Sequence, residues 1–130
     1  MLSRRLALAA ALVAVSGRAF AQTATSVPFE QAAFAAAQKA GKPILVDIWA
    51  SWCPTCAQQK PIIEKLAADP VFKDLVILKV DFDNQKDVVR AFGARSQSTL
   101  IVFHGEQEQG RSVGDTDAAS IRALLARAKA

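Results

Sequence analysis

Residues 44–56 read Ile-Leu-Val-Asp-Ile-Trp-Ala-Ser-Trp-Cys-Pro-Thr-Cys, and they form the most informative stretch of this sequence. Residues 44–50 are almost continuously apolar, which is typical of a strand covered on both faces, as in a parallel sheet. Residues 55–68 then place apolar side chains at helical spacing. The two cysteines therefore fall where a buried strand passes into a helix.

On either side of this stretch, helices and strands continue to alternate along the chain. We expect parallel pairing where a helix connects two strands, and antiparallel pairing where a short turn joins the last two strands. This order predicts an α/β fold with a mixed sheet of four to five strands and helices on both faces. The expected helices are residues 29–40, residues 55–68, a short helix that ends near Phe92, and a last helix with Ile121, Leu124, Leu125 and Ala128 at helical spacing. The expected strands are residues 44–50, 75–82, 99–103 and 109–113, after a loose lead-in at residues 22–27.

The first 21 residues have the pattern of a secretory signal peptide. Arg4 and Arg5 precede an apolar run at residues 6–15, and Ala19-Phe20-Ala21 matches the small-residue pattern of a cleavage site. The apolar run is short for a helix that spans a bilayer, and the alternative is an anchor that is not cleaved. We therefore expect export to the periplasm, cleavage near Ala21, no stable membrane insertion afterwards, and a single domain at residues 22–130.

The basic charge of the whole chain is concentrated in this N-terminal segment. The formal net charge is +4, and removal of Arg4, Arg5 and Arg18 with the signal peptide lowers it to about +1. No basic patch interleaved with aromatic residues remains, so we expect no nucleic-acid partner.

Cys53 and Cys56 are the two cysteines of the chain, and their spacing places both on one face of a helix. Cys53 falls at the helix N-terminus, where unpaired backbone N–H groups and the helix dipole favour a thiolate. The pattern predicts a redox pair in which the Cys53 thiolate attacks a substrate disulfide. Cys56, which we expect to be the more buried cysteine, would then resolve the mixed disulfide. Pro54 costs no backbone hydrogen bond at the first helical position.

Zinc sites use the same Cys-x-x-Cys spacing, but they need at least three protein ligands. The one histidine, His104, follows the strand at residues 99–103 and should lie about 17 Å from the cysteines. We therefore expect an ordinary turn residue at His104, no metal, and no cofactor other than the Cys53–Cys56 disulfide.

Asp47 lies inside the buried strand, where a carboxylate is costly unless it is paired or protonated. Burial should raise the pKa of Asp47, which would suit a proton acceptor for Cys56 during resolution. The alternative is a structural polar residue with satisfied hydrogen bonds. Lys79, in the neighbouring strand, is a candidate charge partner for Asp47, or else it extends to solvent. Trp52, beside the cysteines, is a candidate apolar contact surface for partner proteins.

Residues 46–56, Val-Asp-Ile-Trp-Ala-Ser-Trp-Cys-Pro-Thr-Cys, resemble the strand and active-site segment of the thioredoxin family. The resemblance covers nearly all of residues 22–130, and Pro61 falls where the family has a helix-kinking proline. Family members that lack the first strand of thioredoxin are common, and the element order expected above would make this chain one of them. The resemblance implies a thioredoxin-like fold, with Cys53 as nucleophile, Cys56 as resolving cysteine, Asp47 as buried acid and Lys79 as its partner.

Two departures from the family pattern bear on the chemistry. The residues between the cysteines are Pro54 and Thr55, instead of the Gly-Pro of thioredoxins or the Pro-His of strong exported oxidases. The missing histidine removes one stabiliser of the Cys53 thiolate, which argues against the most oxidising members. Ser98 stands where the family has a cis-proline before threonine, and a cis bond before serine would cost ~2.5–4 kcal/mol.

We therefore expect a trans bond before Ser98 and a reshaped loop beside the sulfurs. One hypothesis is that this loop opens the site to a metal or cluster held between two chains. By the resemblance, the candidate substrate contacts are Trp52, Pro54, Thr55, Gln97, Ser98 and Thr99.

The leading functional hypothesis is a periplasmic thiol–disulfide oxidoreductase that reduces protein disulfides, for example in cytochrome c maturation. Such an enzyme would act as a monomer on protein thiols and disulfides, and would take electrons from a membrane thiol donor because no cofactor motif is present. The alternatives are a weak oxidase or isomerase of the same fold, and a non-catalytic module that holds a partner or a metal.

Overall fold

The computed structural model of the protein describes residues 23–129. The predicted signal peptide, residues 1–21, and its cleavage site lie outside these residues. No helix within residues 23–129 is both long enough and apolar enough to cross a membrane.

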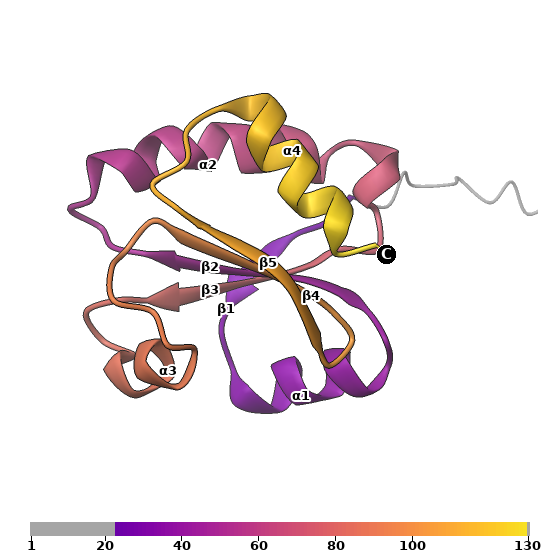
Figure 1. Cartoon of the computed structure of the whole chain (residues 1–130), viewed down its shortest axis with the longest axis horizontal. Coiled ribbons are helices and arrows are strands. Elements are labelled where there is room, and N and C mark those ends of the chain that lie inside the picture. The colour runs from indigo at the N-terminus through magenta and orange to yellow at the C-terminus, as the bar shows by residue number, and fades with distance from the viewer. Residues whose placement is uncertain (1–22, 130) are drawn as a thin grey trace, which may run out of the picture.

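The described residues form a mixed sheet of five strands at the centre of the molecule. The strands are β1 (Ser26–Pro28), β2 (Pro43–Trp49), β3 (Val76–Asp81), β4 (Thr99–His104) and β5 (Gln107–Val113). Their order across the sheet is β1-β3-β2-β4-β5 (Figure 1). β3 is parallel to both β1 and β2, whereas β4 is antiparallel to β2 and β5 is antiparallel to β4. The predicted mixed sheet is confirmed, with its parallel first pair and antiparallel last pair.

Four α-helices of the described region cover the two faces of this sheet. They are α1 (Gln31–Lys39), α2 (Pro54–Ala67), α3 (Lys86–Ala91) and α4 (Ala118–Arg127), with a 3-10 helix, η1, at Pro70–Phe72. Helices α2 and α4 lie on one face of the sheet, and α1 and α3 lie on the other (Figure 1). Helices on both faces are therefore confirmed as well.

The first strand corrects the sequence-based element order. Ser26–Pro28 forms β1 and pairs in parallel with β3, so residues 22–27 are not a loose lead-in throughout. The expectation that this chain lacks the first strand is wrong. All three residues of β1 are exposed, so no alternation of buried and exposed positions marks them as a strand. Pairing with the edge of β3, a tertiary contact, is what makes them one.

Strand β2 contributes to both hydrophobic cores, which confirms the prediction of a strand covered on both faces. Leu45 packs in a core with residues of α2 and α4, whereas Ile44, Val46 and Ile48 belong to the core on the α1 and α3 side. All four side chains have 0% exposure. The second core contains a cluster of phenylalanine rings with centroids 5.3–6.0 Å apart: Phe29, Phe34, Phe92 and Phe103.

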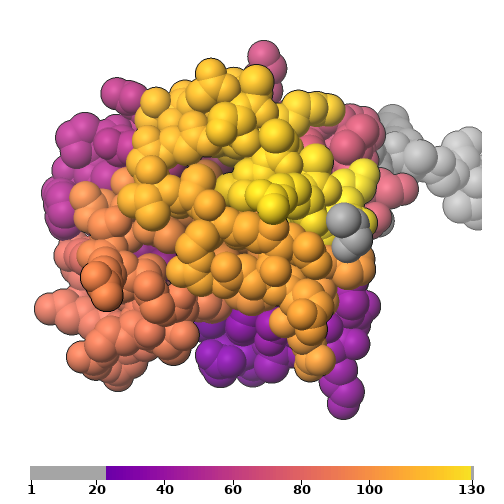
Figure 2. Space-filling view, viewed as in Figure 1, coloured from indigo at the N-terminus to yellow at the C-terminus, as the bar shows by residue number. Residues whose placement is uncertain are grey.

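Helix α4 covers the face of the sheet on which Leu45 lies. It packs over β5 at Gly110, where a Cβ atom would meet Arg127 at 3.0 Å and Leu124 at 3.2 Å. Figure 2 shows the yellow helix lying directly against the orange strand. The apolar stripe predicted for this helix is buried: Ile121, Leu124, Leu125 and Ala128.

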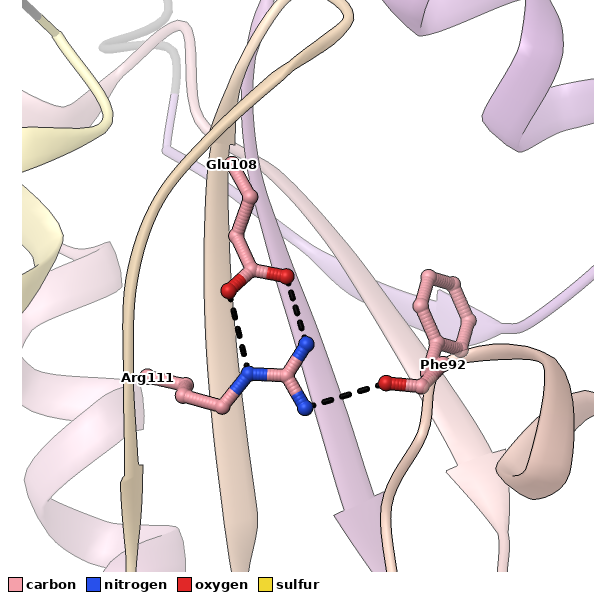
Figure 3. A network of polar contacts seen from close by, with 3 residues as sticks. All are labelled: Phe92, Glu108 and Arg111. Carbon is pink, nitrogen blue, oxygen red and sulfur yellow. Dashed lines mark hydrogen bonds and ion pairs between the residues drawn. The ribbon is translucent and has the colours of Figure 1, made fainter.

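Arg111 links the edge strand β5 to the end of α3 (Figure 3). Its guanidinium forms a two-pronged ion pair with Glu108 on the same strand, with Nε 3.0 Å from Oε2. Its Nη1 donates a hydrogen bond to the main-chain carbonyl of Phe92 at 3.0 Å. Phe92 caps the C-terminus of α3, so Arg111 holds the start of the loop that leads through residues 93–98 into β4.

The topology brings three chain segments to one end of the sheet. Parallel strands β2 and β3 end there side by side, at Trp49 and Asp81. Strand β4 runs in the opposite direction and begins there, with Thr99 opposite Ile48. The loop after β2, which carries Cys53, and the loop before β4 therefore meet.

Candidate active site

Cys53 caps the N-terminus of α2, where the sequence places it. Its Sγ accepts a hydrogen bond from the Cys56 backbone N–H at 3.1 Å, and its own N–H donates to the Ala50 carbonyl at 3.2 Å. Pro54 occupies the first turn of the helix, where a backbone N–H has no partner within the helix, so the N–H that proline lacks costs no hydrogen bond. One of the free N–H groups at the start of α2 is thus directed at the Cys53 sulfur.

Cys53 and Cys56 form a disulfide, with Cα atoms 5.3 Å apart, inside the usual range for such a bond. Cys53 is 4% exposed and Cys56 is 9% exposed, so the expectation that Cys56 is the more buried cysteine is wrong for the oxidised protein. The reason lies outside the helix: Ser98, 45 positions away in sequence, packs against the Cys53 sulfur. Spacing along α2 cannot reveal this contact.

Ser98 has a left-handed backbone conformation, with φ at +57°. Residues 23–129 contain no cis peptide bond, so the predicted trans bond before Ser98 is confirmed. The Ser98 carbonyl accepts hydrogen bonds from Gly114 N–H at 2.9 Å and from Gln59 Nε2 at 3.3 Å. Its Oγ lies 3.9 Å from Cys53 Sγ. The left-handed residue turns the chain into β4 and sets the Ser98 hydroxyl against the sulfur.

The other residues expected to contact substrate differ in accessibility. Pro54 is exposed, while Thr55 and Gln97 are half-buried. Thr99 is buried, and its hydroxyl donates to the Ser96 carbonyl at 2.7 Å. The structure therefore brings the loop before β4 to the cysteines, as Ser98 shows. The Thr99 hydroxyl, however, is already hydrogen-bonded to the Ser96 carbonyl.

Trp52 is the most prominent apolar side chain beside the disulfide, with 57% of its surface exposed. Its Nε1 donates to Asp83 Oδ2 at 2.7 Å, which fixes the orientation of the ring. A second exposed apolar residue, Val113, pairs with Thr99 and so lies at the same end of the sheet.

Asp47 and both cysteines line a cavity of about 270 Å³ together with Lys60 and Lys79. Burial raises the pKa of Asp47 to about 6, while the positive charge of Lys79 opposes the rise. The pKa therefore moves in the direction expected from the sequence. A carboxyl group with this pKa can exchange a proton near neutral pH.

Lys79 lies directly opposite Asp47 in the pairing of β3 with β2. The ion pairs found in residues 23–129 do not include one between Lys79 and Asp47. Instead, Lys79 Nζ lies 4.5 Å from the centre of the Trp49 ring, in a cation–π contact. The positive charge of Lys79 therefore acts on the pKa of Asp47 across the cavity that both residues line, and not through a direct ion pair.

His104 lies at the end of the sheet opposite the cysteines. It is the last residue of β4, not a turn residue as expected from the sequence, and it pairs with Pro43, where β2 begins. Its Nδ1 is 2.9 Å from the Ala128 carbonyl, so it attaches the end of α4 to the sheet. Within the described part of the chain, no group of three His, Cys, Asp or Glu side chains is arranged to hold a metal.

Gln59 is a residue of this site that sequence reasoning missed. It is 1% exposed, and its Nε2 donates to the carbonyls of Ser98 and Asp115 at 3.3 and 2.9 Å. A signal was available, because Gln59 stands at helical spacing before Ile63 and Leu66 and so occupies the buried face of α2. A polar amide at such a position needs partners, and here those partners belong to the loops around the disulfide.

Replacement of Asp47 by asparagine should stabilise the oxidised protein above pH 6. With a pKa near 6 instead of its ordinary value of 3.8, the folded protein binds this proton more tightly than the unfolded chain. The stability contributed by protonated Asp47 is therefore complete at low pH and is lost as the pH rises from 3.8 to about 6. Above that range, Asp47→Asn should raise the free energy of unfolding by roughly 2–3 kcal/mol.

Urea unfolding at about pH 4 and about pH 8 measures this effect, because the gain should appear only at the higher pH. Asp74→Asn, at an exposed position, is the matched control and should show no such dependence. An equal gain for Asp47→Asn at both pH values would contradict the assignment.

A model of the family described as Thioredoxin matches residues 25–127 of this chain. The thioredoxin of Alicyclobacillus acidocaldarius is 32% identical over 104 residues, which cover 80% of this chain and 93% of that protein. The thioredoxin of Mycobacterium bovis is 40% identical over 73 residues, 56% of this chain. The crystal structure of Trxlp from Edwardsiella tarda is similar with a TM-score of 0.76 and 40% identity, covering 78% of this chain and 98% of that one.

The chain spans less than two thirds of some of its relatives. The match covers 62% of the M. bovis thioredoxin and 18% of the bifunctional thioredoxin reductase/thioredoxin of Mycobacterium leprae. The family model, however, covers most of the chain, including β1, the Cys53–Cys56 pair and the loop that carries Ser98. This chain belongs to the thioredoxin family.

Proposed function

We propose that this protein is a periplasmic thiol–disulfide oxidoreductase that reduces protein disulfides through Cys53 and Cys56. The observation that carries the proposal is the position of the Cys53 sulfur at the N-terminus of α2, where it accepts the Cys56 N–H. Such a position favours the thiolate, which is the nucleophile in thiol–disulfide exchange. The signal-peptide pattern of residues 1–21 supports export.

The reaction starts from the reduced pair. The Cys53 thiolate attacks one sulfur of the substrate disulfide, forming a mixed disulfide and releasing the other substrate sulfur as a thiolate that takes up a proton. Cys56 then loses its proton and attacks the Cys53 sulfur, which breaks the mixed disulfide and releases the second substrate thiolate. Two electrons pass to the substrate, and Cys53–Cys56 is left as the disulfide.

Asp47 is proposed as the group that accepts the Cys56 proton in the second step. It lines the same cavity as Cys56, and its raised pKa lets it take up a proton at neutral pH more readily than an ordinary carboxylate. Lys60 and Lys79 line this cavity too, and their positive charges favour a thiolate as it forms.

The oxidised pair must be reduced again after each turnover, and we propose a membrane thiol protein as the donor. The donor and the protein substrates would use the same surface, formed by Trp52, Pro54 and the loop at Gln97. A weak oxidase would use the same residues, with electrons moving from substrate thiols to the Cys53–Cys56 disulfide. An isomerase would use them to rearrange substrate disulfides with no net transfer of electrons.

The reduction potential of the Cys53–Cys56 pair tests the direction of electron flow. We expect equilibration with dithiothreitol or glutathione buffers to give a potential near the ~−270 mV of thioredoxin, because no histidine stands between the cysteines to stabilise the thiolate. A potential near ~−120 mV, typical of a strong oxidant, would contradict the reducing role.

Replacement of Cys56 by serine tests for enzymatic exchange. The variant should form a mixed disulfide with insulin whose disulfides are intact, because Cys53 can attack an accessible disulfide while resolution is blocked. Mass spectrometry under non-reducing conditions should find the adduct on Cys53. The matched variant Cys53→Ser should form far less adduct, and equal adduct formation by the two variants, or none by either, would contradict the assigned roles.

Replacement of Trp52 by alanine tests the docking surface. We expect kcat/KM for insulin reduction to fall about tenfold, as for a large aromatic anchor, because a protein substrate loses a broad apolar contact. Reduction of a small aromatic disulfide should change little, since Cys53 and Cys56 are intact. Val71→Ala removes a similarly exposed apolar side chain, on η1 (48% exposed), and should have no effect on either substrate. An equal loss with both substrates for Trp52→Ala would assign Trp52 to the chemistry instead of docking.

A further inference from the structure

We propose that the Ser98 hydroxyl is a catalytic hydrogen-bond donor to the Cys53 thiolate. It would stabilise the reduced pair and make the disulfide more oxidising than the cysteines and helix α2 alone would make it. The proposal concerns the exchange chemistry of the pair, so it holds for either direction of electron flow and does not depend on export.

The first observation is the contact itself. Ser98 Oγ lies 3.9 Å from Cys53 Sγ, and the two residues are 5% and 4% exposed. A disulfide sulfur carries no proton, so the hydroxyl must be the donor in this contact. A neutral sulfur is a weak acceptor, but a hydrogen bond to an anion is much stronger, and burial strengthens it further. The contact should therefore tighten when Cys53 becomes a thiolate.

The second observation is the backbone of Ser98. It is the one non-glycine residue of the described chain with a positive φ. A glycine would adopt this conformation without a steric penalty, whereas a serine side chain makes it less favourable. Strained residues of this kind concentrate at active sites, where the surrounding structure holds them. Here the side chain that causes the penalty is the one that reaches the sulfur.

The third observation is how firmly the loop is held against α2. Gln59 extends from the same helix that Cys53 caps, and its Nε2 donates to the Ser98 carbonyl. Gly114 N–H donates to that carbonyl as well, and Arg111 holds the beginning of the loop at the Phe92 carbonyl. The hydroxyl is thus placed relative to the sulfur by contacts that do not involve the sulfur.

Together these contacts distinguish the two cysteines. Cys53 Sγ is approached by two donors, the Cys56 N–H and the Ser98 hydroxyl. Within residues 23–129, no hydrogen bond is directed at Cys56 Sγ. The negative charge of the reduced pair should therefore reside on Cys53, and part of the reason should be Ser98.

The test compares Ser98→Ala with Ser98→Gly. Both variants lack the hydroxyl, but alanine keeps the Cβ that strains the backbone and glycine removes it. For each reduced protein, the rate of Cys53 alkylation by iodoacetamide is measured against pH, and the reduction potential is measured at a pH above the alkylation midpoint. Urea unfolding of the oxidised proteins reports their stability.

We expect the alkylation midpoint to rise by about one pH unit in both variants, a tenfold loss in the acid dissociation constant of Cys53. The reduction potential of the Cys53–Cys56 pair should fall by about 30 mV, which corresponds to this tenfold change in the acid dissociation constant. Stability should separate the variants, since Ser98→Gly relieves the strain and Ser98→Ala does not. A shift shared by two variants of different stability identifies the hydroxyl as its cause.

Ser112→Ala is the matched control, because it removes a buried hydroxyl, from a half-buried residue of β5, that has no hydrogen-bond partner among the described residues. Its alkylation midpoint should equal that of the wild type. The proposal is overturned if the midpoint is unchanged in Ser98→Ala and Ser98→Gly. It is also overturned if the two midpoints differ and follow stability, since the shift would then report loop strain.

Discussion

The backbone hydrogen bonds that join β2 to β3 on one side and to β4 on the other fix the positions of the reactive residues. This pairing places Asp47 between Lys79 and Leu100, and it places Ile48 opposite Thr99. Because side chains alternate between the two faces of a strand, a shift of one residue would move Asp47 to the phenylalanine core on the other face. The 0% exposure of its apolar neighbours, Val46 and Ile48, opposes such a shift, so the acid stays beside the cysteines.

The two sulfurs of the disulfide have different surroundings because different elements supply them. Cys53 faces hydrogen-bond donors from the start of α2 and from the loop before β4. Both cysteines line the cavity that holds a buried carboxyl group of raised pKa and two lysines, but among the described residues no hydrogen bond is directed at Cys56 Sγ. A nucleophile requires stabilised negative charge, and a resolving thiol requires a place for its proton. This division agrees with the order of attack proposed for the pair.

Local sequence patterns predicted the parts of this fold in which a strong signal coincides with one element. The apolar run of β2, the helical spacing of α4 and the position of Cys53 at a helix start are of this kind. The strand β1 was missed because its three exposed residues become a strand only by pairing with β3. The order of burial of the cysteines was wrong because Ser98 covers Cys53 from a distant loop.

Ser98 has one feature that the sequence could predict and one that it could not. The cost of a cis bond before serine was enough to predict a trans peptide. The left-handed φ was not predictable, since it depends on carbonyl contacts from Gln59 and Gly114 that belong to two other segments. Gln59 could have been found as a polar residue on an apolar helix face, but its partners could not.

The two edges of the sheet have a consequence for how this protein behaves in a crowded solution. One edge, β1, is three residues long and ends in Pro28, which has no N–H to offer another strand. The other edge, β5, carries the Glu108–Arg111 ion pair. Its pairing with β4 is also irregular, with a register shift between Val102 and Phe103 of β4. Short, charged and bulged edges are poor templates for strand addition from a neighbouring chain. The two edges of this sheet therefore disfavour edge-to-edge association between copies of the chain.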